Sequence, residues 1–174
     1  YGSFNHSMSD QNAFILQAFG ERIATRSGYY DSYHSTFDSN LTRQTAATNN
    51  VTIATNKGQG ADSLACDGHL TGYLTQIDFD LGSGDATNAY AGQLGMYERS
   101  IIYVRPDIFV VVDELKAKEG KKSKFEWWLH SENDIEIYDD RNGCTFNTGA
   151  AVLDTTIAYP HKLTPYYNNI NALS

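Results

Sequence analysis

The sequence predicts an all-β fold, an antiparallel β-sandwich formed by one domain that spans residues 1–174. The first observation is composition, because 12 tyrosines, 8 phenylalanines and 2 tryptophans accompany many threonines, valines and isoleucines, which favour strands over helices. The second is a pattern of short alternating or apolar runs, separated by clusters of Gly, Asn and Asp. The third is length, since 174 residues suffice for one sizeable core and not for two ordinary domains.

Eight such runs predict strands, and one or two helical turns at most are expected beside them. The runs cover residues 13–19, 50–54, 71–81, 100–104, 108–115, 125–130, 135–138 and 151–158. The segment Arg105-Pro106-Asp107 predicts a turn, because proline fixes φ and lacks the N–H that a sheet interior needs. Residues 101–104 and 108–112, on either side of that turn, therefore predict a central hairpin.

The charge balance argues against general binding to polyanions. The chain has 13 Lys+Arg and 21 Asp+Glu, a formal net charge of -8 and a pI near 4.9, so nucleic acid and anionic membranes are not expected partners. An acidic chain that binds an anionic polymer must do so with a few well-placed cations. No apolar run approaches the ~20 residues of a membrane span, and no basic-then-apolar leader opens the chain. Because Tyr1 already stands inside a motif, we expect the chain to be part of a longer protein.

Three further features leave alternatives open. Cys66 and Cys144 are too few for a disulfide framework and lack metal-ligand spacing, but a single disulfide between them is compatible with the sequence. The lysine-rich segment 116–124 is interpreted as a solvated hairpin tip or as a polyanion-binding patch. The segment 28–48, rich in Tyr, Ser, Asp and Asn, is either a long functional loop that offers rings and hydroxyls to a sugar, or an edge packed by tyrosines.

The opening of the chain carries the most information on function. It reads Phe4-Asn5-His6-Ser7-Met8-Ser9-Asp10-Gln11-Asn12-Ala13-Phe14 and places a histidine, an acid and carboxamides directly before an apolar run. The segment resembles the HSHADQNSF motif of the heparinase II/III-like polysaccharide lyases, which carry an active-site histidine on a β-sandwich domain. Met8 stands where that motif has its second histidine.

Further pieces of the chain resemble the same family in the same order. Residues 20–31 (GERIATRSGYYD) are similar to the family's GEPLAIDSGYYD, and residues 42–49 (TRQTAATN) are similar to TRQTKAHN. Four more similar stretches follow, at residues 58–60, 84–90, 99–115 and 126–130. The shared order implies the family's fold, in which an N-terminal α/α toroid precedes the β-sandwich and the polysaccharide lies between the two. The toroid is therefore expected upstream of this chain.

The resemblance implies a lyase that cleaves a uronic-acid polymer by β-elimination. Such an enzyme neutralises the C5 carboxylate, removes the C5 proton and protonates the leaving C4 oxygen, and each preorganised donor at the developing charge is worth about 3 to 4 kcal/mol. A histidine or tyrosine serves as the base. His6 matches the family's histidine and is expected to act as base or as charge-neutralising partner, whereas the family's tyrosine and Asn/His group belong to the toroid. The alternative role of His6 is to hydrogen-bond a loop.

Other residues are expected to bind the substrate or to support the histidine. Arg43 is a candidate for a bidentate contact with a uronate carboxylate, or for a salt bridge that holds the long loop. Tyr30 and His34 are expected to line the same cleft. The candidates from the opening segment, for orienting the histidine ring, binding sugar hydroxyls or capping turns, are Asn5, Asp10, Gln11 and Asn12. Structural roles are expected for His69, His130 and His161.

The family's metal site is expected to be lost in this chain. Family members often hold zinc near the cleft through the second His of HSH, the Asp of AIDSG and the His of KAHN, and the matching residues here are Met8, Arg26 and Thr48. A thioether, a guanidinium and a hydroxyl make no competent ligand set for zinc, so no cofactor is expected. We expect Arg26 to replace the positive charge of the ion by pairing with Asp10 or Asp31.

The retention of His6 and Arg43 favours an active enzyme over a non-catalytic relative. The Asp-Gln-Asn and Gly-Tyr-Tyr-Asp stretches resemble the oligoalginate lyase branch of the family. This resemblance implies alginate or oligoalginate as the substrate, followed by a heparin- or heparan-type glycosaminoglycan. The expected partners are an acidic polysaccharide or oligosaccharide and the toroid of the same protein, and a periplasmic or secreted location follows from a polymer substrate. The alternative function is a non-catalytic carbohydrate-binding or structural β-sandwich module. The isolated sandwich is expected to be inactive.

Overall fold

The structure, a computed structural model, describes residues 8–29, 31–33, 35–60, 64–138, 142–159 and 164. In this part of the chain all strand pairing is antiparallel, and helical structure is confined to short segments, so the all-β expectation is confirmed. The helical segments number three rather than one or two: η1 (Asp38–Thr42), η2 (Thr45–Ala47) and η3 (Asn88–Tyr90). None of the helices in the described residues has the length and apolar character that a bilayer crossing requires.

The largest sheet has the strand order β4-β5-β6-β7. Its strands are β4 (His69–Thr75), β5 (Phe79–Asp85), β6 (Leu94–Val104) and β7 (Ile108–Ala117). Strands β6 and β7 are rich in Ile, Val, Tyr and Phe, which fit a pleated surface, and they form the predicted hairpin around the turn at residues 105–107. The hairpin register pairs Val104 with Ile108 and continues to Arg99 opposite Asp113.

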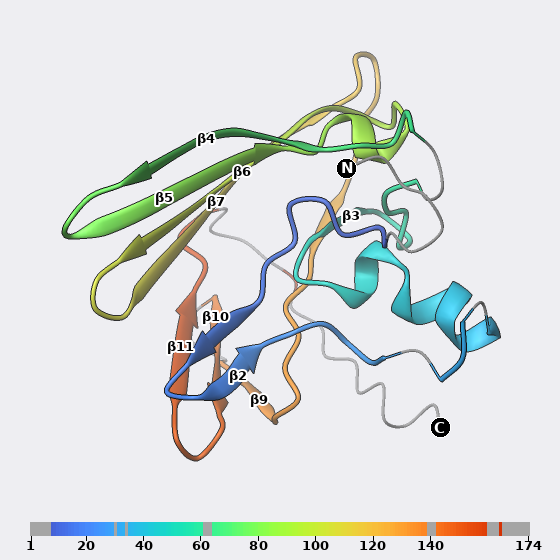
Figure 1. Cartoon of the computed structure of the whole chain (residues 1–174). Helices are drawn as coiled ribbons and strands as arrows, with labels where there is room; N and C mark the ends of the chain where they lie inside the picture. The colour runs from blue at the N-terminus through green and yellow to red at the C-terminus, as the bar shows by residue number, and fades with distance from the viewer. Residues whose placement is uncertain are drawn as a thin grey trace.

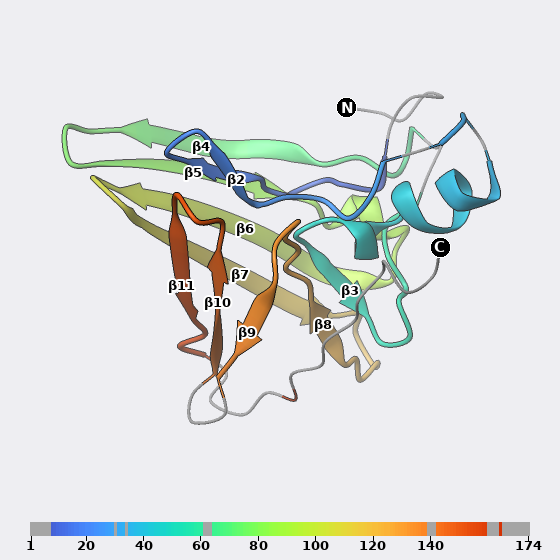
Figure 2. The same cartoon turned by 90° about the horizontal axis from the view of Figure 1, so that it is seen from below.

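Smaller sheets complete the fold. The strands β9 (Ile135–Ile137), β10 (Gly143–Asn147) and β11 (Val152–Thr156) form a three-stranded sheet, while β1 (Leu16–Ala18) pairs with β2 (Glu21–Ala24) and β3 (Val51–Ile53) pairs with β8 (Phe125–Trp127). Figures 1 and 2 show the β9–β11 sheet crossing one face of the β4–β7 sheet at a steep angle. Two sheets that face each other in this way form a sandwich.

The hydrophobic core has two centres. The first packs the end of the large sheet against β3, and in it Tyr90 and Tyr97 meet edge to face with ring centroids 5.7 Å apart. The Tyr97 hydroxyl donates to the Asn50 side-chain oxygen at 2.9 Å, so its polar tip is satisfied inside the core. The second centre joins β2 to β10 and the turn after it through Ile23, Phe146 and Ala151. The first cluster thus packs the four-stranded sheet against β3, and the second packs the β9–β11 sheet against β2.

Some local expectations were wrong. The run at 71–81, predicted as one strand, is a hairpin with its turn at residues 76–78, where Ile77 is exposed and the Gln76 N–H donates to the Phe79 carbonyl. Strands β2 and β10 were not predicted. Cys66 and Cys144 are both free thiols, so the alternative of a disulfide between them is excluded in this structure.

Strand β4 lies at an edge of the four-stranded sheet. All seven of its residues are exposed, and Leu70 and Tyr73 keep 84% and 86% of their surface open. It pairs with β5 on one side, with a register shift between Leu70 and Gly72. The strand contains no charged residue.

Candidate functional site

The segment that follows the expected catalytic histidine is built as a tight turn. His6 lies outside the described residues, as do Asn5, Tyr30 and His34, so their predicted roles stay predictions. From Met8 onward the chain is described, and the Ala13 N–H donates to the Asp10 carbonyl at 2.9 Å. Asn12 has φ +61, a conformation that Asn tolerates better than most residues. The turn ends the opening motif and leads into β1.

Side-chain hydrogen bonds fix this turn to three distant parts of the chain. Gln11 and Gln59 bond reciprocally, the Gln11 N–H to Gln59 Oε1 and Gln59 Nε2 to the Gln11 carbonyl, both at 2.8 Å. Asn50 Nδ2 also donates to the Gln11 carbonyl, at 2.9 Å. Asn12 Nδ2 donates to the Gly84 carbonyl at 2.9 Å, and a Cβ at position 84 would lie 2.5 Å from Asn12 Oδ1, which favours glycine there. In the structure Gln11 and Asn12 therefore serve as anchors.

A buried arginine completes the anchoring. Arg99 is 2% exposed and forms a bidentate pair with Asp113, Nε to Oδ1 at 2.6 Å and Nη2 to Oδ2 at 2.7 Å. Its Nη1 donates to the carbonyls of Asn12 and Asn49 at 2.7 and 2.8 Å. The guanidinium also lies 5.5 Å from the centre of the Phe14 ring. Although burial opposes the charge, the Asp113 pair leaves the pKa of Arg99 raised.

A second arginine, Arg26, lies beside the start of the opening segment. Its Nη1 donates to Met8 Sδ and its Nη2 donates to the Thr42 carbonyl. Its Nε is buried and has no hydrogen-bond partner within the described part of the chain. Arg26 borders a small pocket of about 440 Å³ that residues 10–15, Thr48 and Asn49 also line. A cationic group with an unused donor therefore lies next to the candidate site.

Asp10 shares this pocket and responds to the charge of Arg26. Although the residue as a whole is exposed, protein atoms crowd its carboxyl group, and this burial raises the pKa of Asp10. The Arg26 charge opposes the rise without removing it. Asp31, the other expected partner, instead accepts from the Ser32 N–H and the Ser35 hydroxyl, which lower its pKa. Among the described residues Arg26 forms no ion pair with Asp10 or Asp31, so the expected pairing is not seen. Of the two acids, only Asp10 has its pKa affected by the Arg26 charge, which partly opposes the rise caused by burial.

Arg43 is committed to the long loop that it was expected to hold. Its side chain is 8% exposed, and Nη1 lies 4.0 Å from Asp38 Oδ2. Its guanidinium also lies 5.8 Å from the centre of the Tyr33 ring, and its carbonyl accepts from the Ser9 N–H at 3.1 Å. The salt-bridge alternative thus describes the contacts seen, while a grip on a uronate carboxylate stays a prediction.

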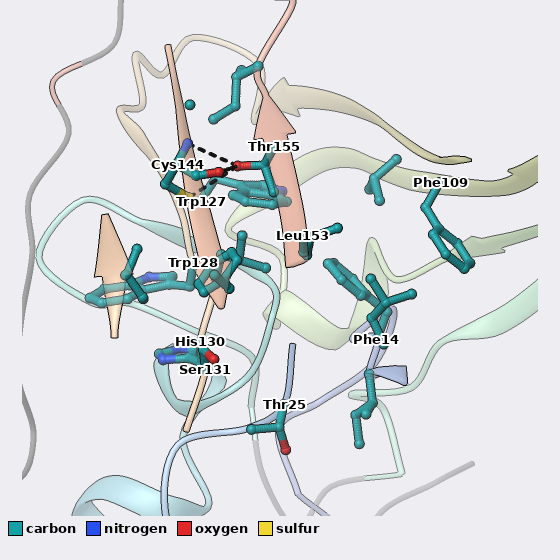
Figure 3. A pocket seen from close by; sticks show the side chains of 18 of the residues that line it. Phe14, Thr25, Phe109, Trp127, Trp128, His130, Ser131, Cys144, Leu153 and Thr155 are labelled. Carbon is teal, nitrogen blue, oxygen red and sulfur yellow. Dashed lines mark hydrogen bonds between the residues drawn. The ribbon is translucent and has the colours of Figure 1, made fainter. Parts of the chain in front are cut away.

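His130 fixes the strand end that carries Arg26. The Thr25 N–H donates to the His130 carbonyl at 3.0 Å, and the Ser27 hydroxyl lies 2.6 Å from His130 Nδ1, so both neighbours of Arg26 are held. The ring stacks on Trp128 with centroids 5.9 Å apart, as Figure 3 shows. Burial lowers the pKa of His130, which favours the neutral ring. The expected structural role of this histidine agrees with these contacts.

A long groove runs between β7 and the β9–β11 sheet and reaches Arg26. Its volume is about 2420 Å³, and Figure 3 shows part of its lining, with Phe14, Phe109 and Trp127 among the side chains. Trp127 and Phe109 are 40% and 37% exposed. Aromatic faces of this kind stack well on the apolar face of a sugar ring. The groove was not predicted from the sequence.

Residues 1–162 match the family described as heparinase II/III-like, C-terminal. The chain belongs to this family. No curated protein matches it. Family membership confirms the resemblance seen in the opening motifs, and it connects the β-sandwich with a polysaccharide-lyase-related role.

The residues at the family's metal positions do not fit zinc. Arg26 donates to Met8 Sδ, so a fixed cation stands against the one soft ligand atom of the set. Thr48 Oγ1 donates to the Thr45 carbonyl at 2.8 Å and is engaged within its own helical turn. Zinc requires imidazole nitrogen, carboxylate oxygen or thiolate, and none of the three positions supplies one.

Arg99 was not predicted as an anchor of this site, and for His130 only a general structural role was predicted, without its partners. A signal for Arg99 was present, because extending the predicted 101–104 and 108–112 hairpin in register places Arg99 directly opposite Asp113. His130 gave no such signal. Its contacts with Thr25 and Ser27 join segments more than 100 residues apart, and no local pattern marks them.

Proposed function

We propose that the full-length protein is a polysaccharide lyase that cleaves a uronic-acid polymer by β-elimination. Alginate or oligoalginate is the preferred substrate, and a heparin- or heparan-type glycosaminoglycan is the second choice. The proposal rests on one observation above all, the family match over residues 1–162 that includes the His6 motif. An N-terminal toroid of the same protein supplies the rest of the active site, and a polymer substrate implies a periplasmic or secreted location.

His6 takes the C5 proton in this proposal, or else helps to neutralise the C5 carboxylate. When the C5 proton leaves, its bonding electrons form the C4–C5 double bond, the C4–O bond breaks, and the leaving oxygen takes up a proton. The product carries an unsaturated uronate that absorbs in the ultraviolet. The support from geometry is the anchored turn after His6, because Gln11 and Asn12 are bonded to Gln59, Asn50 and Gly84.

Arg26 supplies the positive charge that zinc supplies elsewhere in the family, so the protein works without a metal. This proposal is supported by the contact of Arg26 with Met8 and by its effect on the pKa of Asp10. No direct Arg26–Asp10 ion pair forms among the described contacts, so the coupling acts through space. Stoichiometric zinc found by elemental analysis of the full-length protein would contradict it.

Substitution of His6 tests the lyase proposal. In the full-length protein, His6→Ala should lower the rate of ultraviolet absorbance increase about 10²- to 10⁴-fold while polymer binding persists. His69→Ala is the matched control, because His69 is an exposed histidine of β4 whose side chain makes none of the hydrogen bonds that anchor the turn, and it should retain wild-type turnover.

Two outcomes would reject parts of this proposal. Wild-type turnover in the His6→Ala variant would exclude His6 from the chemistry. No unsaturated product from alginate, oligoalginate, heparin or heparan with the wild-type protein would exclude the lyase assignment. Comparison of initial rates on the alginate and glycosaminoglycan substrates then tests the substrate order.

A non-catalytic carbohydrate-binding module is the second candidate function. It is favoured by the half-exposed Trp127 and Phe109 in the groove, since such rings bind sugars without chemistry. Under this alternative the wild-type protein binds polysaccharide and releases no unsaturated product. Trp127→Ala should then abolish binding, whereas His6→Ala should leave it unchanged.

A further inference from the structure

The lysines of this chain are gathered in one place. The sequence contains seven lysines, and six of them fall in two short stretches: Lys57, Lys116, Lys118, Lys121, Lys122 and Lys124. All six are exposed. We call this set the lysine patch. The catalytic proposal above makes no use of it.

The fold brings Lys57 to the other five. Strand β3 pairs with β8, so that Ile53 lies opposite Phe125, and the Ala54 N–H donates to the Lys124 carbonyl at 2.8 Å. Ile53 and Lys57 exchange two backbone hydrogen bonds of 2.8 and 2.9 Å, which close the turn that carries Lys57. The turn that carries Lys57 therefore lies beside Lys124, at the end of the lysine-rich segment.

The connection from β7 to β8 projects from one end of the molecule, as Figure 1 shows. Its turn is closed by the Lys121 N–H, which donates to the Lys118 carbonyl at 2.9 Å, and Gly120 adopts φ +72 within it. Lys118 extends toward the neighbouring turn, since a Cβ at Gly92 would lie 3.8 Å from its Nζ. The connection thus has a defined shape that carries four charges from Lys118 to Lys124.

These charges are largely unpaired. Lys124 lies 4.0 Å from a Glu126 carboxylate oxygen, and within the described residues the other five lysines have no carboxylate within 4.0 Å. The arginines differ, because four of them have aspartate or glutamate partners: Arg22, Arg43, Arg99 and Arg105. These four arginines are engaged within the fold, whereas five of the six patch lysines have no carboxylate within 4.0 Å among the described residues.

The patch is also opposite in sign to the rest of the chain. Its six lysines together with Glu119 and Glu126 carry a formal charge of +4, which leaves -12 on the remainder of a chain whose net charge is -8. An acidic polymer is therefore repelled by most of the surface and attracted to this end. Such an imbalance orients a polyanion within about a Debye length, roughly 10 Å at 0.1 M salt.

We propose that the lysine patch is a secondary binding site for an acidic polysaccharide, separate from the catalytic site. The identity of the polymer rests on the proposed lyase function. Short basic stretches such as Lys121-Lys122-Ser123-Lys124 suit polyanions like heparin. Because Lys124 also lines the groove that reaches Trp127 and Arg26, a polymer chain lying in the groove continues onto the patch. The patch retains long polymers near the active site and contributes nothing to short oligosaccharides.

Charge removal in the full-length protein tests this site. Lys121→Gln with Lys122→Gln removes two patch charges, and Thr71→Glu with Thr75→Glu shifts the net charge by the same amount at exposed positions of β4. Binding of fluorescently labelled long alginate and heparin is measured against NaCl concentration. The patch variant should lose about tenfold in affinity at low salt, and its log–log salt slope should fall by about two. The β4 variant should stay within about twofold of wild type.

The readouts separate this proposal from the lyase proposal. Weaker binding of long polymer by the patch variant, with unchanged cleavage of short oligosaccharides, supports the patch. Equal binding by the patch and β4 variants overturns the patch and leaves the lyase proposal intact. Weaker binding by the patch variant of a protein that forms no unsaturated product supports the patch and rejects the lyase. Single-stranded DNA of equal total charge that displaces the polysaccharide equally well overturns the assignment to a polysaccharide.

Discussion

Arg99 and Arg26 show two uses of the same side chain within one domain. Arg99 is enclosed, and its guanidinium makes two bonds to Asp113 and two to backbone carbonyls. Arg26 is half-buried, donates to a thioether and one carbonyl, and keeps a buried Nε with no partner in the described residues. Of the five N–H donors of a guanidinium, Arg99 uses four in these bonds and Arg26 uses two.

The difference identifies which arginine can take part in function. A fully paired buried guanidinium stabilises geometry and leaves little for a ligand. A partly paired one, beside a pocket and an acid with a shifted pKa, retains both charge and donor capacity. The distinction lies in the partners, which the sequence alone does not display.

The largest expected effect is on stability, at Arg99. Arg99→Met leaves the largely buried Asp113 carboxylate without a counter-charge, with the Trp127 indole N–H as its remaining side-chain donor among the described contacts. The change should destabilise the sandwich by about 3–5 kcal/mol. Denaturant unfolding followed by tryptophan fluorescence measures this loss. Arg105→Met is the matched control, because its pair with Asp80 is more than one-third exposed, and it should cost about 1 kcal/mol or less. Equal losses of unfolding free energy in Arg99→Met and Arg105→Met would contradict the special structural role of Arg99.

A different signature is expected when Arg26 is changed. Arg26→Met should alter stability by about 1 kcal/mol or less and lower turnover about 10- to 100-fold, as for other groups that orient an active-site side chain. The pKa of Asp10 should rise further, because burial is then unopposed by a positive charge. NMR titration of Asp10 follows this, with Asp31 as internal reference. A large stability loss with unchanged turnover would place Arg26 in the same structural class as Arg99.

The smallest expected effect is a pH dependence at His130. Its pKa is lowered by burial, so the stability contributed by the neutral ring is fully present above the unfolded value, about 6.5. That contribution is lost as pH falls through the lower folded value. The wild type should therefore lose more unfolding free energy between pH 7.5 and pH 5 than His130→Gln. If the unfolding free energies of the two proteins change equally with pH, the contacts of His130 with Thr25 and Ser27 do not depend on the neutral ring.

Local sequence patterns were sufficient to predict much of the fold. The Arg105-Pro106-Asp107 turn and the strands around it were predicted, because β-branched and aromatic runs and proline act through neighbouring residues. The run at 71–81 was predicted as one strand although it spans a hairpin turn, because the apolar Ile77 lies in that turn and interrupts no hydrophobic pattern. Strand β10 was missed because Gly143, Thr145 and Asn147 weaken its apolar pattern.

The site depended more on long-range contacts. The anchors Gln11 and Asn12 were proposed with both structural and functional roles, and only the bonds to Gln59 and Gly84 reveal the former. The Arg26–Met8 contact likewise joins two positions that the sequence assigned to one lost metal site, without indicating that they touch. Contacts of this kind form only when distant segments come together in the folded chain, and no periodic pattern in the sequence predicts them.

The uncharged edge at β4 has a practical consequence. Residues 69–77 contain no Lys, Arg, Asp or Glu. An edge strand with exposed Leu70 and Tyr73 and no charged side chain is a template for cross-molecule pairing. Concentrated preparations of the sandwich alone will tend to associate strand to strand. Tyr73→Lys would place a charge on this edge strand, oppose pairing between molecules and keep such preparations monodisperse.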